Sequence, residues 1–297
     1  MFNWNDLESF ITLSRTGKLN LSSKKLKIEP TTISRRILRL EEQLEIKLFV
    51  RSNNFYSLTD NGQKLLKYAE RIETETLSIG EIFSNKNLNV SGTVRIAVPE
   101  GLGVEVFSLY LEKFYKIHPE IEIELLADTK VRNMSTREID ISIVFSRPQK
   151  GKLISKKLTG YQLKLYGSKE YIENNKSIRS IKDLNEHKFI SYIDDLIGYP
   201  ELKNLLDLHK NIKIVFRSNS LIAQLHAVKQ GIGLSLLHHF IAREQKDLKL
   251  LLEDHIKFSR EYWIVVHQDL ITLKRVRVVL DFFSNVIKKE KNNFIIN

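Results

Sequence analysis

Six side chains suited to contacting nucleic acid lie between residues 31 and 39. They are hydroxyl and guanidinium groups on the side of a predicted helix that faces away from its apolar stripe: Thr31, Thr32, Ser34, Arg35, Arg36 and Arg39. Guanidinium forks match the O6 and N7 acceptors of guanine, hydroxyls reach phosphates or bases, and the helix dipole favours anions at the N-terminus. This face predicts a recognition helix for the DNA major groove, although a solvated amphipathic helix can have the same composition.

Two predicted helices and a proline would hold this face in place. The second helix has one apolar stripe at intervals of four, three and four residues, formed by Ile33, Ile37, Leu40 and Leu44. Pro30 fixes its own φ angle and keeps Glu29 out of the α region, so a turn separates the two helices. Asn20 is a suitable N-cap for the first helix. The spacing predicts a helix-turn-helix.

The flanking segments complete a small domain. Upstream, four apolar residues share one helix face and predict a further helix: Trp4, Leu7, Phe10 and Ile11. Downstream, residues 48–59 contain two short apolar runs around Ser52, Asn53 and Asn54, which is the pattern of a β-ribbon with a polar tip. Three helices and a ribbon predict a winged helix-turn-helix domain.

This segment resembles the N-terminal domain of the LysR-type transcriptional regulators. The shared pattern is Leu7-x-x-Phe10, Gly17, Leu26-x-Ile28, Ile33-Ser34-Arg35-Arg36-Ile37-x-x-Leu40-Glu41, Leu48-Phe49-x-Arg51 and Leu58-Thr59-x-x-Gly62. Two departures stand out. The paired alanines of the family's second helix are Ser22 and Ser23 here, and its Ser-Gln-Pro before the recognition helix reads Glu29-Pro30-Thr31. The family's usual half-site preference is therefore not transferred to this chain.

The resemblance implies a division of labour among the DNA-binding residues. Base contacts are expected from Thr32, Arg35, Arg36 and Arg39. Phosphate contacts are expected from Lys24, Lys25, Arg51, Asn53 and Asn54. Ser22, Thr31 and Ser34 complete the expected DNA-binding set.

Composition and charge agree with this interpretation. The 297-residue chain is long enough for two or three compact units, and it has no cysteine, which excludes disulfides, thiolate metal sites and cysteine nucleophiles. We expect a soluble cytoplasmic protein, since no signal peptide or membrane-spanning run is apparent. The net charge is +11, and residues 15–58 contain ten Lys or Arg against four Asp or Glu. Positive charge is thus concentrated where DNA would bind. The remaining charge is spread thinly, as a second DNA- or polymerase-facing surface or as an ordinary basic surface.

A long helix is predicted to follow Thr59, its N-cap. Apolar or small residues recur in it at alternating intervals of four and three: Leu65, Ala69, Ile72, Thr76, Ile79 and Phe83. This heptad seam predicts pairing with a second copy, or packing against the chain's own body. The resemblance implies a linker helix that dimerises antiparallel and holds two winged helices against a two-fold symmetric site.

Beyond a polar break at residues 85–92, strands and helices alternate, which predicts an α/β fold with mainly parallel sheets. Strands are expected at 93–98, 121–126, 139–145, 162–166, 188–193, 213–217, 233–237 and 262–267, and helices at 102–118 and 272–289. The resemblance implies two Rossmann-like lobes, as in periplasmic solute-binding proteins. The expected domains are 1–59 (winged helix), 60–92 (linker) and 93–297 (effector domain), with lobe I at 93–158 and 268–297 and lobe II at 159–267.

An effector site is expected between the lobes, because ligands of such folds bind at the carboxyl ends of strands. Its expected residues are Pro99, Glu100, Gly101, Asp128, Thr129, Phe145, Ser146, Ile193, Asp194, Ser218 and Asn219. Glu100, Asp128, Asp194 and Asp195 would make the mouth acidic and favour a cationic or neutral ligand over a simple carboxylate. In an alternative interpretation, these carboxylates cap helix N-termini and face water.

No catalytic residue, metal or cofactor is expected, since Gly-x-Ser-x-Gly, HExxH and Walker motifs are missing and His226, His238 and His239 lack zinc-like spacing. The predicted function is a sequence-specific transcriptional regulator controlled by a small-molecule effector. Its expected partners are double-stranded promoter DNA, further copies of itself in a dimer or tetramer, and RNA polymerase. A solute-binding or enzymatic α/β protein with an accessory helical domain is the alternative. A third possibility is a DNA-binding protein whose C-terminal region only oligomerises.

Overall fold

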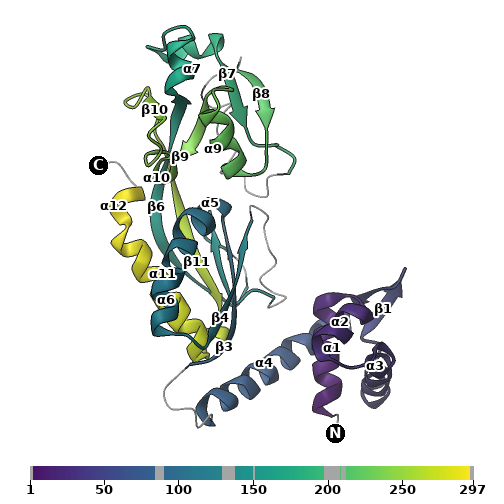
Figure 1. Cartoon of the computed structure of the whole chain (residues 1–297). Coiled ribbons are helices and arrows are strands. Elements are labelled where there is room, and N and C mark those ends of the chain that lie inside the picture. Colours follow the sequence, from purple (N-terminus) through teal and green to yellow (C-terminus); the bar gives the residue numbers. More distant parts are fainter. Residues whose placement is uncertain are drawn as a thin grey trace. The chain divides into compact units, whose positions relative to one another are not determined.

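The computed structural model describes residues 3–83, 90–128, 138–149, 151–196, 208 and 212–294. The chain divides into two compact units, Met1–Asn87 and Leu88–Asn297 (Figure 1). Each unit has a hydrophobic core of its own. The long helix expected to link the domains belongs to the first unit.

The first unit is a winged helix-turn-helix with a long helix attached, as predicted. Its elements are α1 (Trp4–Thr16), α2 (Leu19–Leu26), α3 (Pro30–Leu44), β1 (Phe49–Ser52), β2 (Phe55–Leu58) and α4 (Asp60–Phe83). The apolar stripes of α1 and α3 meet in one core, where Phe10, Ile33 and Leu40 are fully buried. The expected N-cap is wrong by two residues, because α2 begins at Leu19 after Lys18 and Asn20 lies inside it.

The wing is a tight hairpin. Asn53 and Asn54 have φ angles of 45° and 63°, and the ladder closes at the pair Ser52 and Phe55. Positive φ at both central residues is what a two-residue type I′ turn requires, and asparagine tolerates it well. The polar tip predicted from the sequence is therefore confirmed, and its asparagines are exposed.

A buried carboxylate attaches the wing to α3. Glu41 is only 6% exposed. Its Oε1 accepts hydrogen bonds from the Leu48 amide at 2.8 Å and the Phe49 amide at 3.3 Å, and its Oε2 accepts one from Lys47 Nζ at 2.7 Å. These bonds satisfy the amides at the start of β1 and fix where the wing begins relative to the recognition helix.

The heptad seam of α4 divides into two parts. Thr59 Oγ1 accepts a hydrogen bond from the Gly62 amide at 3.0 Å, which confirms the predicted cap. Leu65 is partly buried and Ala69 fully buried in the core of this unit, so the expectation that they face a partner is wrong. They are covered because α4 packs against α1, where Arg15 forms a bidentate ion pair with Glu73. The exposed stripe is instead Tyr68, Ile72, Thr76, Ile79 and Phe83.

The second unit is built on a seven-stranded sheet in the order β10-β6-β11-β5-β3-β4, with β9 also paired to β6. Its strands are β3 (Gly92–Val98), β4 (Ile121–Ala127), β5 (Ile141–Val144), β6 (Leu153–Ser168), β9 (Ser235–His238), β10 (Leu248–Leu251) and β11 (Phe258–His267). A separate two-stranded sheet pairs β7 (Lys188–Ser191) with β8 (Lys213–Arg217). All predicted strands are present.

The predicted dominance of parallel pairing is wrong. β3 pairs in parallel with β4 and β5, but β6 pairs antiparallel with β9, β10 and β11, and β11 pairs antiparallel with β5. The sheet is mixed because β6 is a single strand of 16 residues that runs through most of the unit beside β11 (Figure 1). The predicted strand 162–166 covers only part of the C-terminal half of β6, and β10 was not predicted.

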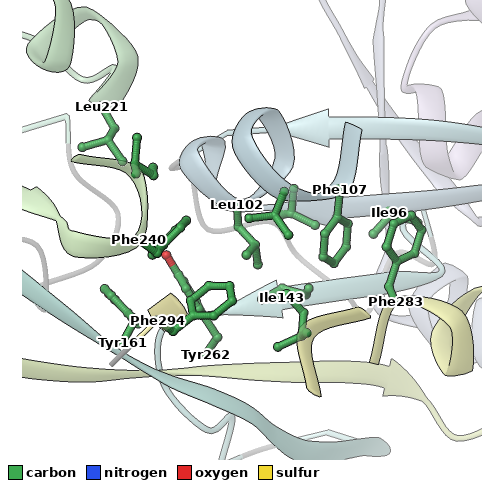
Figure 2. Packing of buried hydrophobic residues seen from close by; sticks show 14 of the residues in the cluster. Ile96, Leu102, Phe107, Ile143, Tyr161, Leu221, Phe240, Tyr262, Phe283 and Phe294 are labelled. Carbon is green, nitrogen blue, oxygen red and sulfur yellow. The ribbon is translucent and has the colours of Figure 1, made fainter. Parts of the chain in front are cut away.

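The helices of the second unit lie against this sheet. They are α5 (Glu100–Leu102), a π-helical turn η1 (Gly103–Phe107), η2 (Ser108–Tyr110), α6 (Leu111–Ile117), α7 (Lys169–Glu173), η4 (Ile181–Glu186), α9 (Leu221–Lys229), α10 (His239–Ala242), η6 (Leu270–Thr272), α11 (Lys274–Lys289) and α12 (Lys291–Phe294). The predicted helix 102–118 is thus broken into four helical pieces. The helix predicted at 272–289 is present as α11, and the ring of its Phe283 stacks on that of Phe107 at 4.1 Å between ring centroids (Figure 2).

An aromatic core lies where β6 and β11 change register, and it consists of Phe145, Tyr161, His238, Phe240 and Tyr262. Tyr161 of β6 stacks on Tyr262 of β11 at 4.2 Å between ring centroids (Figure 2). The Tyr262 hydroxyl lies 3.1 Å from His238 Nδ1. Burial lowers the pKa of His238 from 6.5 to about 3, so this imidazole is neutral in the folded protein.

We predict that Glu41→Ala loosens the wing. The buried amides of Leu48 and Phe49 lose their acceptor, which should cost about 1–3 kcal/mol of stability in the first unit. Hydrogen exchange of residues 47–58 in the full-length protein should become faster. The control is Glu42→Ala, which removes an exposed carboxylate one residue away and should change stability by less than about 0.5 kcal/mol. Equal exchange in the two variants would contradict the role of Glu41.

We predict that His238 makes the second unit sensitive to acid. Its folded pKa is depressed, so its contribution to stability is complete above pH 6.5 and is lost as the pH falls towards 3. The slope is up to about 1.4 kcal/mol per pH unit. His238→Gln has no such proton uptake, so the difference in unfolding free energy between wild type and variant should shrink between pH 7 and pH 5 in urea titrations. A pH-independent difference would refute this assignment.

Candidate nucleic-acid interface and effector site

The N-terminal half of α3 presents a polar face to solvent. Pro30 occupies its first turn, and Glu29 is the N-cap without a side-chain capping bond. Thr31 and Arg35 are exposed, while Thr32 and Ser34 are half-buried. Within the described part of the chain, Arg35 makes no hydrogen bond or ion pair. Its guanidinium is therefore free to contact a ligand.

Two other arginines of α3 bind α1 instead. Arg39 Nε donates to Asp6 Oδ2 at 2.7 Å and its Nη2 donates to Asp6 Oδ1, and Asp6 is fully buried. Arg36 Nη1 donates to Ser9 Oγ at 3.2 Å. The expected base contact of Arg39 is corrected here, because withdrawing it would leave a buried carboxylate unpaired. Arg36 is held on the same flank, away from the face of Arg35.

The expected residues of α2 and the wing differ in availability. Ser22 is fully buried, and its Oγ donates to the Lys18 carbonyl at 3.1 Å and lies 2.6 Å from Thr16 Oγ1. It therefore joins α2 to α1 and is not a DNA contact, which corrects the prediction. Lys24 and Lys25 are exposed in the last turn of α2.

The exposed wing positions are Arg51, Asn53 and Asn54. Arg51 Nη2 donates to Asn54 Oδ1 at 2.8 Å, and its guanidinium lies 5.7 Å from the centre of the Tyr56 ring. These contacts restrict the direction of the Arg51 side chain while leaving its charge at the surface.

Leu38 is a candidate that the sequence analysis missed. It is 50% exposed, although it lies in the middle of a helix whose other large aliphatic residues are in the core. Its spacing of three residues from Arg35 and seven from Thr31 places all three on one helix face. That spacing was visible in the sequence, but only polar side chains were considered. An apolar group on a recognition helix can contact the methyl group of thymine.

The predicted ligand role of Glu100 is replaced by a structural one. Its Oε1 accepts a hydrogen bond from Ser220 Oγ at 2.7 Å, and its Oε2 accepts one from the Leu221 amide at 2.6 Å. Ser220 is the N-cap of α9, with its Oγ accepting from the Ala223 amide at 3.1 Å. The interpretation in which this carboxylate caps a helix N-terminus therefore holds.

Two other acidic residues of the expected mouth, Asp194 and Asp128, also have partners within the described part of the chain. Asp194 is exposed and accepts a hydrogen bond from Arg217 Nη1 at 3.0 Å, so its charge is compensated. Asp128 follows β4, and its amide donates to the Val98 carbonyl at 3.0 Å. The preference for a cationic ligand therefore loses its electrostatic basis at Glu100 and Asp194.

The remaining effector positions are dispersed between core and surface. Phe145 belongs to the aromatic core, 5.6 Å from the Tyr262 ring, so its expected contact with a ligand is corrected. Pro99 and Gly101 are buried, Ile193 and Ser218 are half-buried, and Ser146 and Asn219 are exposed. Thr129 lies outside the described residues. The segments that follow β3 and β8 thus meet through Glu100, Ser220 and Leu221.

The described residues contain no group of three His, Asp or Glu side chains placed to hold a metal ion. His238 and His239 each pair with a tyrosine, with His239 Nδ1 lying 2.7 Å from the Tyr166 hydroxyl. Among the described helices, none is both long and apolar enough to cross a bilayer.

Comparison with known proteins covers almost the whole chain. Residues 4–63 match the family described as bacterial regulatory helix-turn-helix protein, lysR family, and residues 88–288 match the LysR substrate binding domain. A probable RuBisCO transcriptional regulator of Phaeodactylum tricornutum is 27% identical over 285 residues, which cover 90% of each protein.

Solved structures show the same fold. A full-length OxyR variant from Pseudomonas aeruginosa has a TM-score of 0.74 at 16% identity, covering 97% of this chain and 95% of that one. CrgA, a LysR-type transcriptional regulator from Neisseria meningitidis, has a TM-score of 0.60 at 21% identity, covering 97% and 99%. Since the substrate-binding-domain match alone spans more than half of the sequence, this chain belongs to the LysR family of transcriptional regulators.

Proposed function

We propose that this LysR-type regulator reads double-stranded promoter DNA through the exposed face of α3. The observation that carries the proposal is the division of that helix. Its inner face is bound to α1 by the core and by Arg39, while Thr31, Arg35 and Leu38 are left at the surface. A rigid helix that presents a guanidinium, a hydroxyl and an apolar group is suited to reading base edges.

Phosphate contacts would come from the charges beside this helix. Lys24 and Lys25 at the end of α2 and Arg51 on the wing are exposed, and ion pairs within the described residues do not neutralise them. Such contacts position a protein on DNA without reading its sequence. The wing asparagines would add hydrogen bonds to the backbone.

Self-association would use the exposed stripe of α4. Tyr68, Ile72, Ile79 and Phe83 are 65%, 41%, 57% and 75% exposed, and they lie at heptad-like intervals with Thr76. Pairing two such helices antiparallel would give a two-fold axis that matches an inverted repeat. A tetramer, contact with RNA polymerase and a non-enzymatic C-terminal unit complete the proposal.

The test is a selection from random duplex DNA with the full-length protein at physiological salt. Enrichment of an interrupted inverted repeat would support a dimeric regulator, whatever the sequence of its half-sites. Recovery of only salt-sensitive, non-specific binding would contradict it and favour the alternative of a solute-binding or enzymatic protein with an accessory helical domain.

On the selected site, Arg35→Ala should cost roughly 1–3 kcal/mol of binding and relax one base position, because a bidentate guanine contact is lost. Lys24→Ala is the matched control. It should weaken binding evenly across sequences and lower the salt slope by about 1. Binding titrations with cognate and scrambled duplexes at several salt concentrations measure both. If both variants weaken all sequences equally, Arg35 does not read a base.

Leu38 should be recognisable by its dependence on a thymine methyl group. Replacing one thymine per half-site by uracil removes only that methyl group and should weaken wild-type binding about 2- to 10-fold at a single position, which is the order of one lost apolar contact. Leu38→Ala should bind thymine and uracil duplexes equally well. A wild-type protein indifferent to uracil at every position would remove Leu38 from the base-reading set.

A further inference from the structure

Glu100 connects two parts of the second unit that are far apart in sequence. It begins α5, directly after β3, and its carboxylate contacts the N-terminus of α9, which follows β8. Both carboxylate oxygens are engaged, one by the Ser220 hydroxyl at 2.7 Å and the other by the Leu221 amide at 2.6 Å. The contact therefore holds the segment that follows β3 against the segment that follows β8.

The surroundings of this contact are tightly packed. Leu221 is 3% exposed. A Cβ atom added at Gly101 would lie 2.6 Å from Leu221 Cδ2 and 2.8 Å from Ile241 Cδ1, so α5 approaches α9 as closely as a glycine permits. Burial, with the nearby Glu100 charge, raises the pKa of the Tyr192 phenol. Glu100 and Ser220 are themselves half-buried, so the hydrogen bonds of the carboxylate are partly shielded from water.

The donors that Glu100 meets are those that a free carboxylate ligand would use. The first amides of α9 lack partners inside the helix, the helix dipole is positive at this end, and Ser220 adds a hydroxyl. A small anionic molecule entering between α5 and α9 would compete for the same donors. In this chain the Glu100 carboxylate supplies the anion at this position.

We propose that Glu100 is a built-in ligand of the C-terminal unit. Its carboxylate occupies a carboxylate position at the N-terminus of α9 and keeps α5 and α9 together without any small molecule. The consequence for regulation, which rests on the proposed function, is that small carboxylates do not change DNA binding by the wild-type protein. The deletion of this side chain opens the position to carboxylates from solution.

The experiment is chemical rescue of full-length Glu100→Ala. The variant should melt several degrees below wild type, because the Ser220 hydroxyl and the Leu221 amide lose their acceptors. Sodium propionate, which supplies the missing carboxylate on a short alkyl chain, should restore the melting temperature in a saturable manner. Wild type should show no saturable shift. Sodium chloride at equal ionic strength and the neutral isostere propionamide should not restore the variant.

Two further variants exclude general effects. Glu100→Gln keeps the shape of the side chain, so it should be destabilised but not rescued, since its amide still fills the position. Glu112→Ala removes an exposed carboxylate of α6 that pairs only with Lys116 among the described residues, and it should neither melt earlier nor respond to propionate. Melting of Glu100→Ala at the wild-type temperature, or rescue equal to that by chloride, would overturn the proposal.

Two readouts separate this inference from the proposed function. If Glu100→Ala is too unstable to purify, Glu100→Asp can be used, since its side chain is one methylene too short to reach α9. Its hydrogen exchange in residues 218–225 should be faster than in wild type. Unchanged exchange would overturn the proposed role of the Glu100 contact with α9. With the duplex found by selection, propionate should change the DNA affinity of Glu100→Ala several-fold and leave wild type unaffected. Rescue of melting without any specific DNA binding would confirm the built-in ligand and refute the DNA-binding function.

Discussion

The carboxylate of Asp6 is fully buried beneath the recognition helix, and Arg39 of that helix neutralises it. A buried charge without a partner is strongly destabilising, so this pair constrains how α3 lies against α1. Arg36 donates to α1 from the same flank. With that flank occupied, Thr31, Arg35 and Leu38 form the face that remains, and the proposed contacts with DNA depend on this division of the helix.

Carboxylates with distant donors recur at the other functional junctions. Glu41 of α3 accepts hydrogen bonds from the first amides of the wing, and so connects β1 to α3. The Glu100 carboxylate accepts hydrogen bonds from a hydroxyl and an amide at the N-terminus of α9, and so connects α5 to α9. At each position, the burial of an acidic side chain is compensated by hydrogen bonds from donors on another element. Asp6, Glu41 and Glu100 thereby act as structural connectors, although Glu100 was expected to contact a ligand.

Two long antiparallel strands run through the C-terminal unit. β6 and β11 pair along most of their length, and the register shifts beside Tyr262, where the aromatic core packs. Any change in the angle between the ends of this unit has to deform that pair and the stacked tyrosines. The Glu100 contact also holds α5 against α9, so separating these two helices requires breaking both of its hydrogen bonds.

Local patterns were sufficient for much of this molecule. The apolar periodicity of α1 and α3, the asparagine pair of the wing and the Thr59 cap could all be identified from the sequence, because each depends on residues within a few positions of one another. The winged helix and the alternation of strands and helices followed from them. The resemblance to LysR regulators needed only these spacings.

Contacts between distant residues decided the rest. The sequence pattern placed Arg39 on the exposed face, Ala69 in the heptad seam and Glu100 in the cleft. In the structure, Arg39 pairs with Asp6 and Ala69 is buried where α4 packs against α1. Glu100 binds the N-terminus of α9. The same limit applies to β6, whose antiparallel partner β11 lies about a hundred residues away in the sequence. Sequence determines which residues can form a helix face or a strand. Only the tertiary structure decides which face is covered. Burial and charge pairing require two elements in contact, whereas hydrophobic periodicity describes a single segment.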